Sequence, residues 1–150
     1  MLSPVTLGRC AQVIDVRDLA EWVLRAGRTA TTGAVYAVGT SSSLGDVLDR
    51  SARLAGFTGT AVERHDGWLL DRGVGFWAGP RSLPLWLPVA ASGFAERSGA
   101  RYLASGGRLR TIDDTIAAAL SDERRRGLHR LRRAGLTRAE ELDLLHDTAL

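Results

Sequence analysis

The sequence predicts an α/β fold, a small mixed sheet with flanking helices, and three observations support this prediction. Four helix-start signatures are each followed by an apolar stripe, short β-branched segments lie between them, and the two kinds of segment alternate along the chain. Strands that alternate with helices are typical of α/β proteins. The chain has 150 residues, of which 45% are apolar and 25% charged, enough for one globular domain with a hydrophobic core.

The four predicted helix starts share a capping residue that is followed three positions later by an acid. The capping side chain accepts a hydrogen bond from a backbone N–H that the helix leaves unpaired. The four pairs are Asp18 with Glu21, Ser43 with Asp46, Thr111 with Asp114, and Thr137 with Glu140. We expect the first three helices to end at Gly27, Gly56 and Gly127, and the fourth to be a short helix around Leu142 and Leu145.

The predicted strands are short and rich in β-branched residues. They cover residues 12–16, 34–38, 60–63 and 108–110. Asp15 and Arg17 would share one face of the first strand, where they could pair with each other or meet a ligand. Asp18 is the expected N-cap of the helix that follows.

Residues 66–87 lose regular periodicity and combine aromatic side chains with glycines and prolines. Aromatic faces on a turn-rich segment can bind a nucleotide base, a sugar or a flat apolar ligand, and they can equally fill the core. An Arg in the same segment could hold a phosphate or carboxylate through its planar guanidinium. Similar candidates follow it at Arg97, Arg101, Arg108 and Arg110, although solvated surface charge is the expected state of most of them. The candidate substrate-binding residues are therefore Trp68, Trp77, Arg81 and Trp86.

Composition limits the other possibilities. The single cysteine, Cys10, excludes an internal disulfide, and the three histidines have no metal-ligand spacing, so we expect no metal site. The adjacent pair His65 and Asp66 does not form an acid–base dyad by proximity alone, since neighbours on an extended chain point in opposite directions. We see neither a signal peptide nor an apolar run long enough to cross a membrane, so a cytoplasmic location is the expectation.

The stretch 13–24, VIDVRDLAEWVL, resembles the strand-to-helix passage that opens the C-terminal, substrate-binding half of the NAD-dependent epimerase/dehydratase family, the extended short-chain dehydrogenases. Residues 33–39, GAVYAVG, look like a later strand of that family, and residues 111–126 like its closing helix. The resemblance covers about residues 11 to 127. It implies that residues 1–127 form a substrate-binding α/β domain without the Rossmann half, and that 128–150 form an Arg-rich, then acidic, helical tail.

This chain departs from the family where the family performs its chemistry. It has no G-x-G-x-x-G turn for a pyrophosphate. It has no Lys at all, so the family's pair of a catalytic Tyr and a Lys four residues later is missing: Thr40 follows Tyr36 at that spacing, and Gly106 follows Tyr102. We assign no catalytic residue and expect no dehydrogenase activity from the chain alone.

The resemblance implies a sugar nucleotide or a small carbonyl compound as the ligand, and NAD or NADP as the cofactor of full-length relatives. It also implies a partner, either a second copy or a chain with a Rossmann domain. One alternative is a non-catalytic ligand-binding or assembly module. Another is a nucleic-acid binder, because residues 124–138 hold seven Arg and no acid, although acids follow at once.

Overall fold

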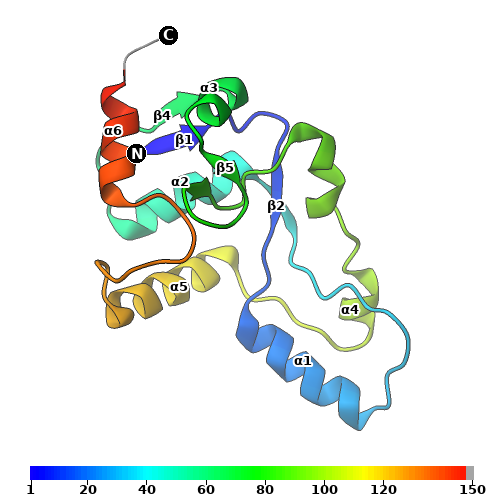
Figure 1. Ribbon diagram of the computed structural model, residues 1–150. Helices are drawn as coiled ribbons and strands as arrows, with labels where there is room; N and C mark the ends of the chain where they lie inside the picture. Colours follow the sequence, from blue (N-terminus) through cyan, green and yellow to red (C-terminus); the bar gives the residue numbers. More distant parts are fainter. Residues whose placement is uncertain (148–150) are drawn as a thin grey trace.

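The computed structural model describes residues 1–147 as a mixed α/β fold, which confirms the predicted class (Figure 1). The helices of this part are α1 Val16–Arg28, α2 Leu44–Ala55, α3 Asp66–Asp71, the 3-10 helix η1 Val89–Ala95, α4 Ala100–Ala104, α5 Ile112–Arg126 and α6 Arg138–His146. Within residues 1–147, none of these helices is long and apolar enough to cross a membrane.

The strands form three separate two-stranded sheets instead of the predicted single mixed sheet. In the described residues, β1 Leu2–Pro4 is parallel to β4 Val62–Arg64, β2 Cys10–Gln12 is antiparallel to β3 Ser41–Ser43, and β5 Gly75–Phe76 is parallel to β6 Ser82–Leu83. The predicted strands at 12–16 and 60–63 overlap β2 and β4 only in part. The segments 34–38 and 108–110 are irregular, because a segment forms a strand only where a neighbouring strand pairs with it.

The predicted caps are confirmed for α2, α5 and α6. The side chains of Ser43, Thr111 and Thr137 each accept a hydrogen bond from the backbone N–H three residues later. Gly56 ends α2 in the left-handed conformation, with φ 74°. A glycine suits this position because it has no Cβ to clash.

The predictions for the ends of α1 are wrong. The N-cap is Asp15, whose side chain accepts a hydrogen bond from the Arg17 N–H, so the helix begins at Val16 and Asp18 lies inside its first turn. At the other end, Gly27 is part of the helix, and Thr29 caps it.

A hydrophobic cluster joins the two ends of the chain. Its buried members are Leu2, Trp68, Leu69, Val74, Trp86 and Leu144. Helix α6 contributes Leu144, and its Glu141 carboxylate accepts a hydrogen bond from the Leu2 N–H at 3.0 Å. The segment that the sequence assigns to a tail beyond residue 127 thus packs into the core. Its last residues, 148–150, lie outside the described part.

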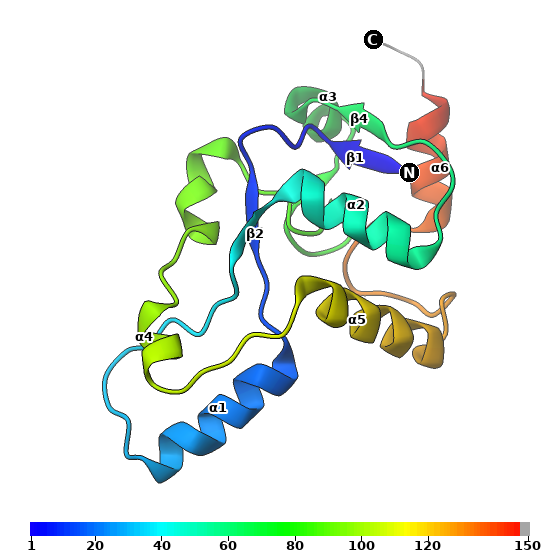
Figure 2. The same ribbon diagram turned by 180° about the vertical axis from the view of Figure 1, so that it is seen from behind.

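A second cluster places α2 between β2 and α5. Leu44 and Val47 of α2 are buried against Ala11 of β2, and Ile112 of α5 packs against them. Both views show α1 and α4 at one end of the molecule, and α3, α6 and β1 at the other, with β2 running between the two ends (Figures 1 and 2).

Candidate functional site

A cavity of about 490 Å³ opens beside β2. Small-molecule sites typically occupy roughly 300–1,000 Å³, so the cavity is large enough for an organic ligand. Its wall combines three parts of the chain: Cys10, Ala11 and Gln12 of β2; Tyr36 and Val38 of the irregular segment; and Trp77, Leu85, Leu87, Phe94, Ala95 and Arg97. Most of these side chains are apolar or aromatic.

Gln12 holds the wall together. Its side-chain oxygen accepts a hydrogen bond from the Arg97 N–H at 2.9 Å. Its Nε2 donates to the Arg97 carbonyl at 2.9 Å and to the Gly39 carbonyl at 3.1 Å. Gly39 passes so close to the Val13 carbonyl oxygen that a Cβ atom there would lie 1.8 Å from it. The Gln12 amide therefore positions the backbone of the wall, and its hydrogen bonds are used within the protein.

Two wall residues have a backbone conformation that non-glycine residues rarely adopt. The φ angles of Trp77 and Leu85 are 63° and 64°. The Ala78 N–H donates to the Phe76 carbonyl at 2.7 Å, so Trp77 is the centre of a γ-turn with positive φ, and the Trp77 N–H donates to the Trp86 carbonyl at 3.0 Å. Such conformations are strained, and they concentrate at ligand sites where the strain serves a role in positioning.

The wall exposes large aromatic rings. Trp77 is 43% exposed, Phe94 56% and Tyr36 57%. The rings of Trp77 and Phe94 meet edge to face, with centroids 5.2 Å apart, and the Arg97 guanidinium lies 5.7 Å from the centre of the Tyr36 ring. Among the described residues, Arg97 is the one charged side chain that lines this cavity, and no carboxylate faces it.

Of the four predicted substrate-binding residues, Trp77 lines the cavity and the other three lie elsewhere. Trp68 and Trp86 are buried in the core, where the Arg72 guanidinium lies 4.0 Å from the Trp68 ring and the Trp86 Nε1 donates to Asp66 at 3.2 Å. The Arg81 Nε donates to the Arg72 carbonyl at 3.1 Å, and its Nη1 lies 3.4 Å from Glu140.

Sequence reasoning did not assign Tyr36, Phe94 or Gln12 to a site, and it named Arg97 only as one of several arginines that could hold a phosphate or carboxylate. Gln12 and Arg97 are 85 residues apart, and no local pattern announces their contact. The available signal was an aromatic residue, Phe94, outside any predicted apolar stripe.

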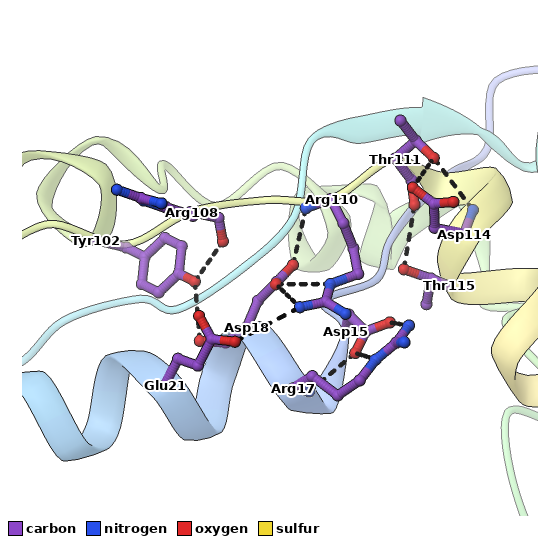
Figure 3. A network of polar contacts seen from close by, with 10 residues as sticks. All are labelled: Asp15, Arg17, Asp18, Glu21, Tyr102, Arg108, Arg110, Thr111, Asp114 and Thr115. Atoms are coloured by element: carbon purple, nitrogen blue, oxygen red, sulfur yellow. Dashed lines mark hydrogen bonds and ion pairs between the residues drawn. The ribbon is translucent and has the colours of Figure 1, made fainter.

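A polar network surrounds the start of α1 (Figure 3). Asp15 pairs with Arg17 at 2.6 Å, as one of the two interpretations of the sequence predicted, although both residues belong to a helix start and not to a strand. The Arg17 guanidinium and N–H hold the pKa of Asp15 well below its usual range. The Asp18 carboxylate binds both the backbone N–H and the guanidinium of Arg110.

Tyr102 belongs to the same network. Its hydroxyl lies 2.7 Å from the Arg108 carbonyl, to which it donates, and 3.4 Å from the Asp18 carbonyl. The side chain is fully buried, and burial raises the pKa of its phenol. This tyrosine fixes the segment that leads into α5.

The remaining polar candidates also have structural partners. The His65 Nδ1 accepts a hydrogen bond from the Trp68 N–H at 3.1 Å and caps α3, while Asp66 binds Arg9. In residues 1–147, no three His, Cys, Asp or Glu side chains are grouped so that they could hold a metal ion.

Much of the Arg-rich segment is neutralised by acids of the chain. Asp122 binds Arg125 and Arg126, while Glu123 binds Arg126, Arg130 and Arg132. Arg130 and Arg132 hold the pKa of Glu123 below its ordinary value. These pairs reduce the net charge that the segment presents to a phosphate backbone.

The start of α1 does not fit the pyrophosphate of a dinucleotide. In dinucleotide sites the free N–H groups of a helix that follows a strand face the phosphates. Here the Asp15 carboxylate already accepts the Arg17 N–H at 2.8 Å, and Asp18 adds a second carboxylate in the same turn. These carboxylates occupy the place beside the helix N-terminus that a phosphate would need, so we derive no step through a nicotinamide cofactor.

Comparison of the chain with protein-family models, with curated proteins and with solved structures finds no match. An exposed aromatic cavity with one guanidinium can bind a ligand, and the described residues of its wall contain no nucleophile–base pair.

Proposed function

We propose that this chain is the ligand-binding portion of a protein similar to the NAD-dependent epimerases and dehydratases. In this proposal the cavity beside β2 holds the substrate, and NAD or NADP is bound by a separate Rossmann domain. The observation that carries the proposal is the cavity itself, with three exposed aromatic rings in its wall. Exposed aromatic surface in a concave site is stabilised when a ligand covers it.

Three features of the chain support a separate domain for the cofactor. The chain has no Lys, the Tyr102 hydroxyl is bonded to backbone carbonyls, and the helix N-terminus after β2 carries carboxylates. Hydride transfer would then need a second domain or chain that holds the cofactor against the cavity. The family resemblance suggests a sugar nucleotide or a small carbonyl compound as the substrate.

The proposal is tested by localised ligand binding. Cys10, the single thiol, lines the cavity and is partly exposed, so its alkylation by iodoacetamide reports whether the cavity is occupied. UDP-glucose, the neutral ketone 2-acetylnaphthalene and NADPH are each added before alkylation, and the modified fraction is measured by mass spectrometry. We expect protection by UDP-glucose or the ketone and none by NADPH. Protection by NADPH would contradict the proposal. A Cys10 that none of the three compounds and no other small organic ligand protects would also contradict it.

A second candidate function, assembly with another protein, is favoured by α1. Val16, Val23 and Leu24 are 73%, 53% and 65% exposed on this helix. An apolar helix surface of this kind suits a protein partner. The two functions are compatible, because a substrate-binding portion must contact the domain that carries its cofactor.

A further inference from the structure

We infer that the cavity beside β2 binds a planar aromatic ligand that carries one anionic group, with the rings against Trp77 and Phe94 and the anion at Arg97. This inference rests on the proposed function, since it names the ligand class of the same site. It departs from the sugar nucleotide that the family resemblance suggests.

The shape and chemistry of the wall suit a planar aromatic ligand. Trp77 and Phe94 present two large rings, both about half exposed, in a wall that also contains Val38, Leu85 and Ala95. A flat unsaturated ligand covers such rings by stacking or by edge contacts, each worth a useful share of binding energy. A hydroxyl-rich sugar would leave its polar groups without partners against this surface.

The wall has few polar groups, and the amide of Gln12 already makes its hydrogen bonds within the protein. Both ends of the Gln12 amide bind the backbone of residues 39 and 97. A sugar nucleotide needs many hydrogen-bond partners for its hydroxyls and its diphosphate, and Gln12 cannot supply them without releasing the wall.

The charge of the wall favours an anion. Arg97 lines the cavity, Gln12 holds its backbone in place, and within residues 1–147 no carboxylate lines the same cavity. A guanidinium binds a carboxylate through two parallel N–H bonds. The site therefore favours an anion over a neutral group, and a neutral group over a cation.

The strained backbone agrees with this placement. Trp77 and Leu85 lie in the wall and both have positive φ, as Ala30 and Arg81 do outside it. The γ-turn places the Trp77 ring at the cavity beside Phe94. The ring that would contact the ligand is therefore the one whose backbone is strained.

The test is calorimetric titration with three ligands that share one ring system and differ in charge. These are 2-naphthoate, the neutral 2-naphthamide and the cation 2-naphthylmethylammonium. We expect 2-naphthoate to bind about tenfold tighter than the amide, because a hydrogen bond to a charged group adds that much. We expect the cation to bind least. Equal affinity for 2-naphthoate and the amide overturns the inference.

Variants assign the effect to residues. Arg97→Gln should reduce the preference for 2-naphthoate over the amide to about twofold or less. Arg124→Gln removes the same charge from the end of α5 and should leave the preference unchanged. Trp77→Ala should weaken all three ligands. Arg97 and Trp77 are both exposed, so the variants are expected to fold, which circular dichroism checks. A preference that survives in Arg97→Gln overturns the placement of the anion.

Failure of this inference can be told apart from failure of the proposed function. If UDP-glucose or 2-acetylnaphthalene protects Cys10 while 2-naphthoate neither binds nor protects, the ligand class is wrong and the proposed function stands. If no ligand of any class protects Cys10, both are wrong.

Discussion

The carboxylate of Asp18 accepts two hydrogen bonds from Arg110, which lies 92 residues further along the chain. One comes from the backbone N–H at 2.8 Å and the other from Nε at 2.7 Å. The Asp18 side chain is 5% exposed and that of Arg110 26%. Figure 3 shows Tyr102 beside this pair, with its hydroxyl directed to the Asp18 and Arg108 carbonyls. The contact attaches α1 to the segment that leads into α5.

Removal of the Asp18 carboxylate should destabilise the fold strongly. Asp18→Ala leaves a partly buried guanidinium and a backbone N–H without their acceptor, and we expect the free energy of unfolding to fall by about 3 kcal/mol. Urea denaturation measures this change. The matched control is Glu21→Gln, which removes an acid 3.8 Å from the same guanidinium but 71% exposed. It should cost less than about 0.5 kcal/mol. Equal effects of the two variants would contradict the importance of the buried contact.

The same pair explains why the sequence could not assign the N-cap of α1. Asp15 and Asp18 are both good caps, and local propensity does not choose between them. Arg110 decides which aspartate is the cap, because it binds Asp18 and leaves Asp15 to accept the Arg17 N–H. The caps at Ser43, Thr111 and Thr137 have no such competitor, and there the local signal was sufficient.

The sequence predicted that aromatic residues would form the candidate site, but not which of them. A cluster of tryptophans in a turn-rich segment predicts a core or a cavity, and the structure contains both. Trp68 and Trp86 are buried because Leu2 and Leu144, from the two ends of the chain, pack with them. Trp77 is exposed because its turn directs it away from that cluster. Contacts between residues far apart in the sequence decide whether a tryptophan is buried in the core or exposed in the cavity. Sequence periodicity gives no information about these contacts.

Two substitutions at Trp77 should differ in stability and agree in their loss of ligand binding. Because its φ is 63°, glycine relieves strain there while alanine keeps it. We expect Trp77→Gly to be about 1 kcal/mol more stable than Trp77→Ala in urea denaturation. Both variants should lose affinity for naphthalene ligands, since both lack the ring. A Gly variant that is less stable than the Ala variant would show that the turn is not strained.

Asp15 should make stability depend on acid pH. The Arg17 side chain lowers its pKa in the folded state, so the unfolded chain binds this proton first as the pH falls. The stabilisation is present above the ordinary Asp pKa of about 4 and is lost progressively below it. Asp15→Asn keeps a good N-cap without the charge. This variant should therefore be less stable than the unaltered chain at pH 6. The difference between their free energies of unfolding, measured by urea denaturation, should shrink as the pH falls from 6 to 3.

A residue without a titrating group provides the control for this titration. Leu131→Ala changes an apolar side chain that is 94% exposed, and its stability difference from the unaltered chain should stay the same between pH 6 and pH 3. A deficit of Asp15→Asn that stays constant from pH 6 to pH 3 would show that the Asp15–Arg17 pair is not linked to folding.

The exposed face of α1 should mediate association. Residues 16, 20, 23 and 27 recur at helical spacing, and Val16 and Val23 are 73% and 53% exposed, with Leu24 beside them at 65%. Apolar surface of this kind is stabilised when a second protein surface covers it. We expect the chain to form dimers whose fraction rises with concentration in sedimentation, and the double variant Val23→Glu, Leu24→Glu to be monomeric.

The control is Leu131→Glu, which places a negative charge at an apolar residue that lies outside α1 and is 94% exposed. This variant should leave the dimer intact. An unaltered chain that stays monomeric at every concentration would show that copies of this chain do not cover α1, and a Rossmann-domain partner would be the next to test by the same variants.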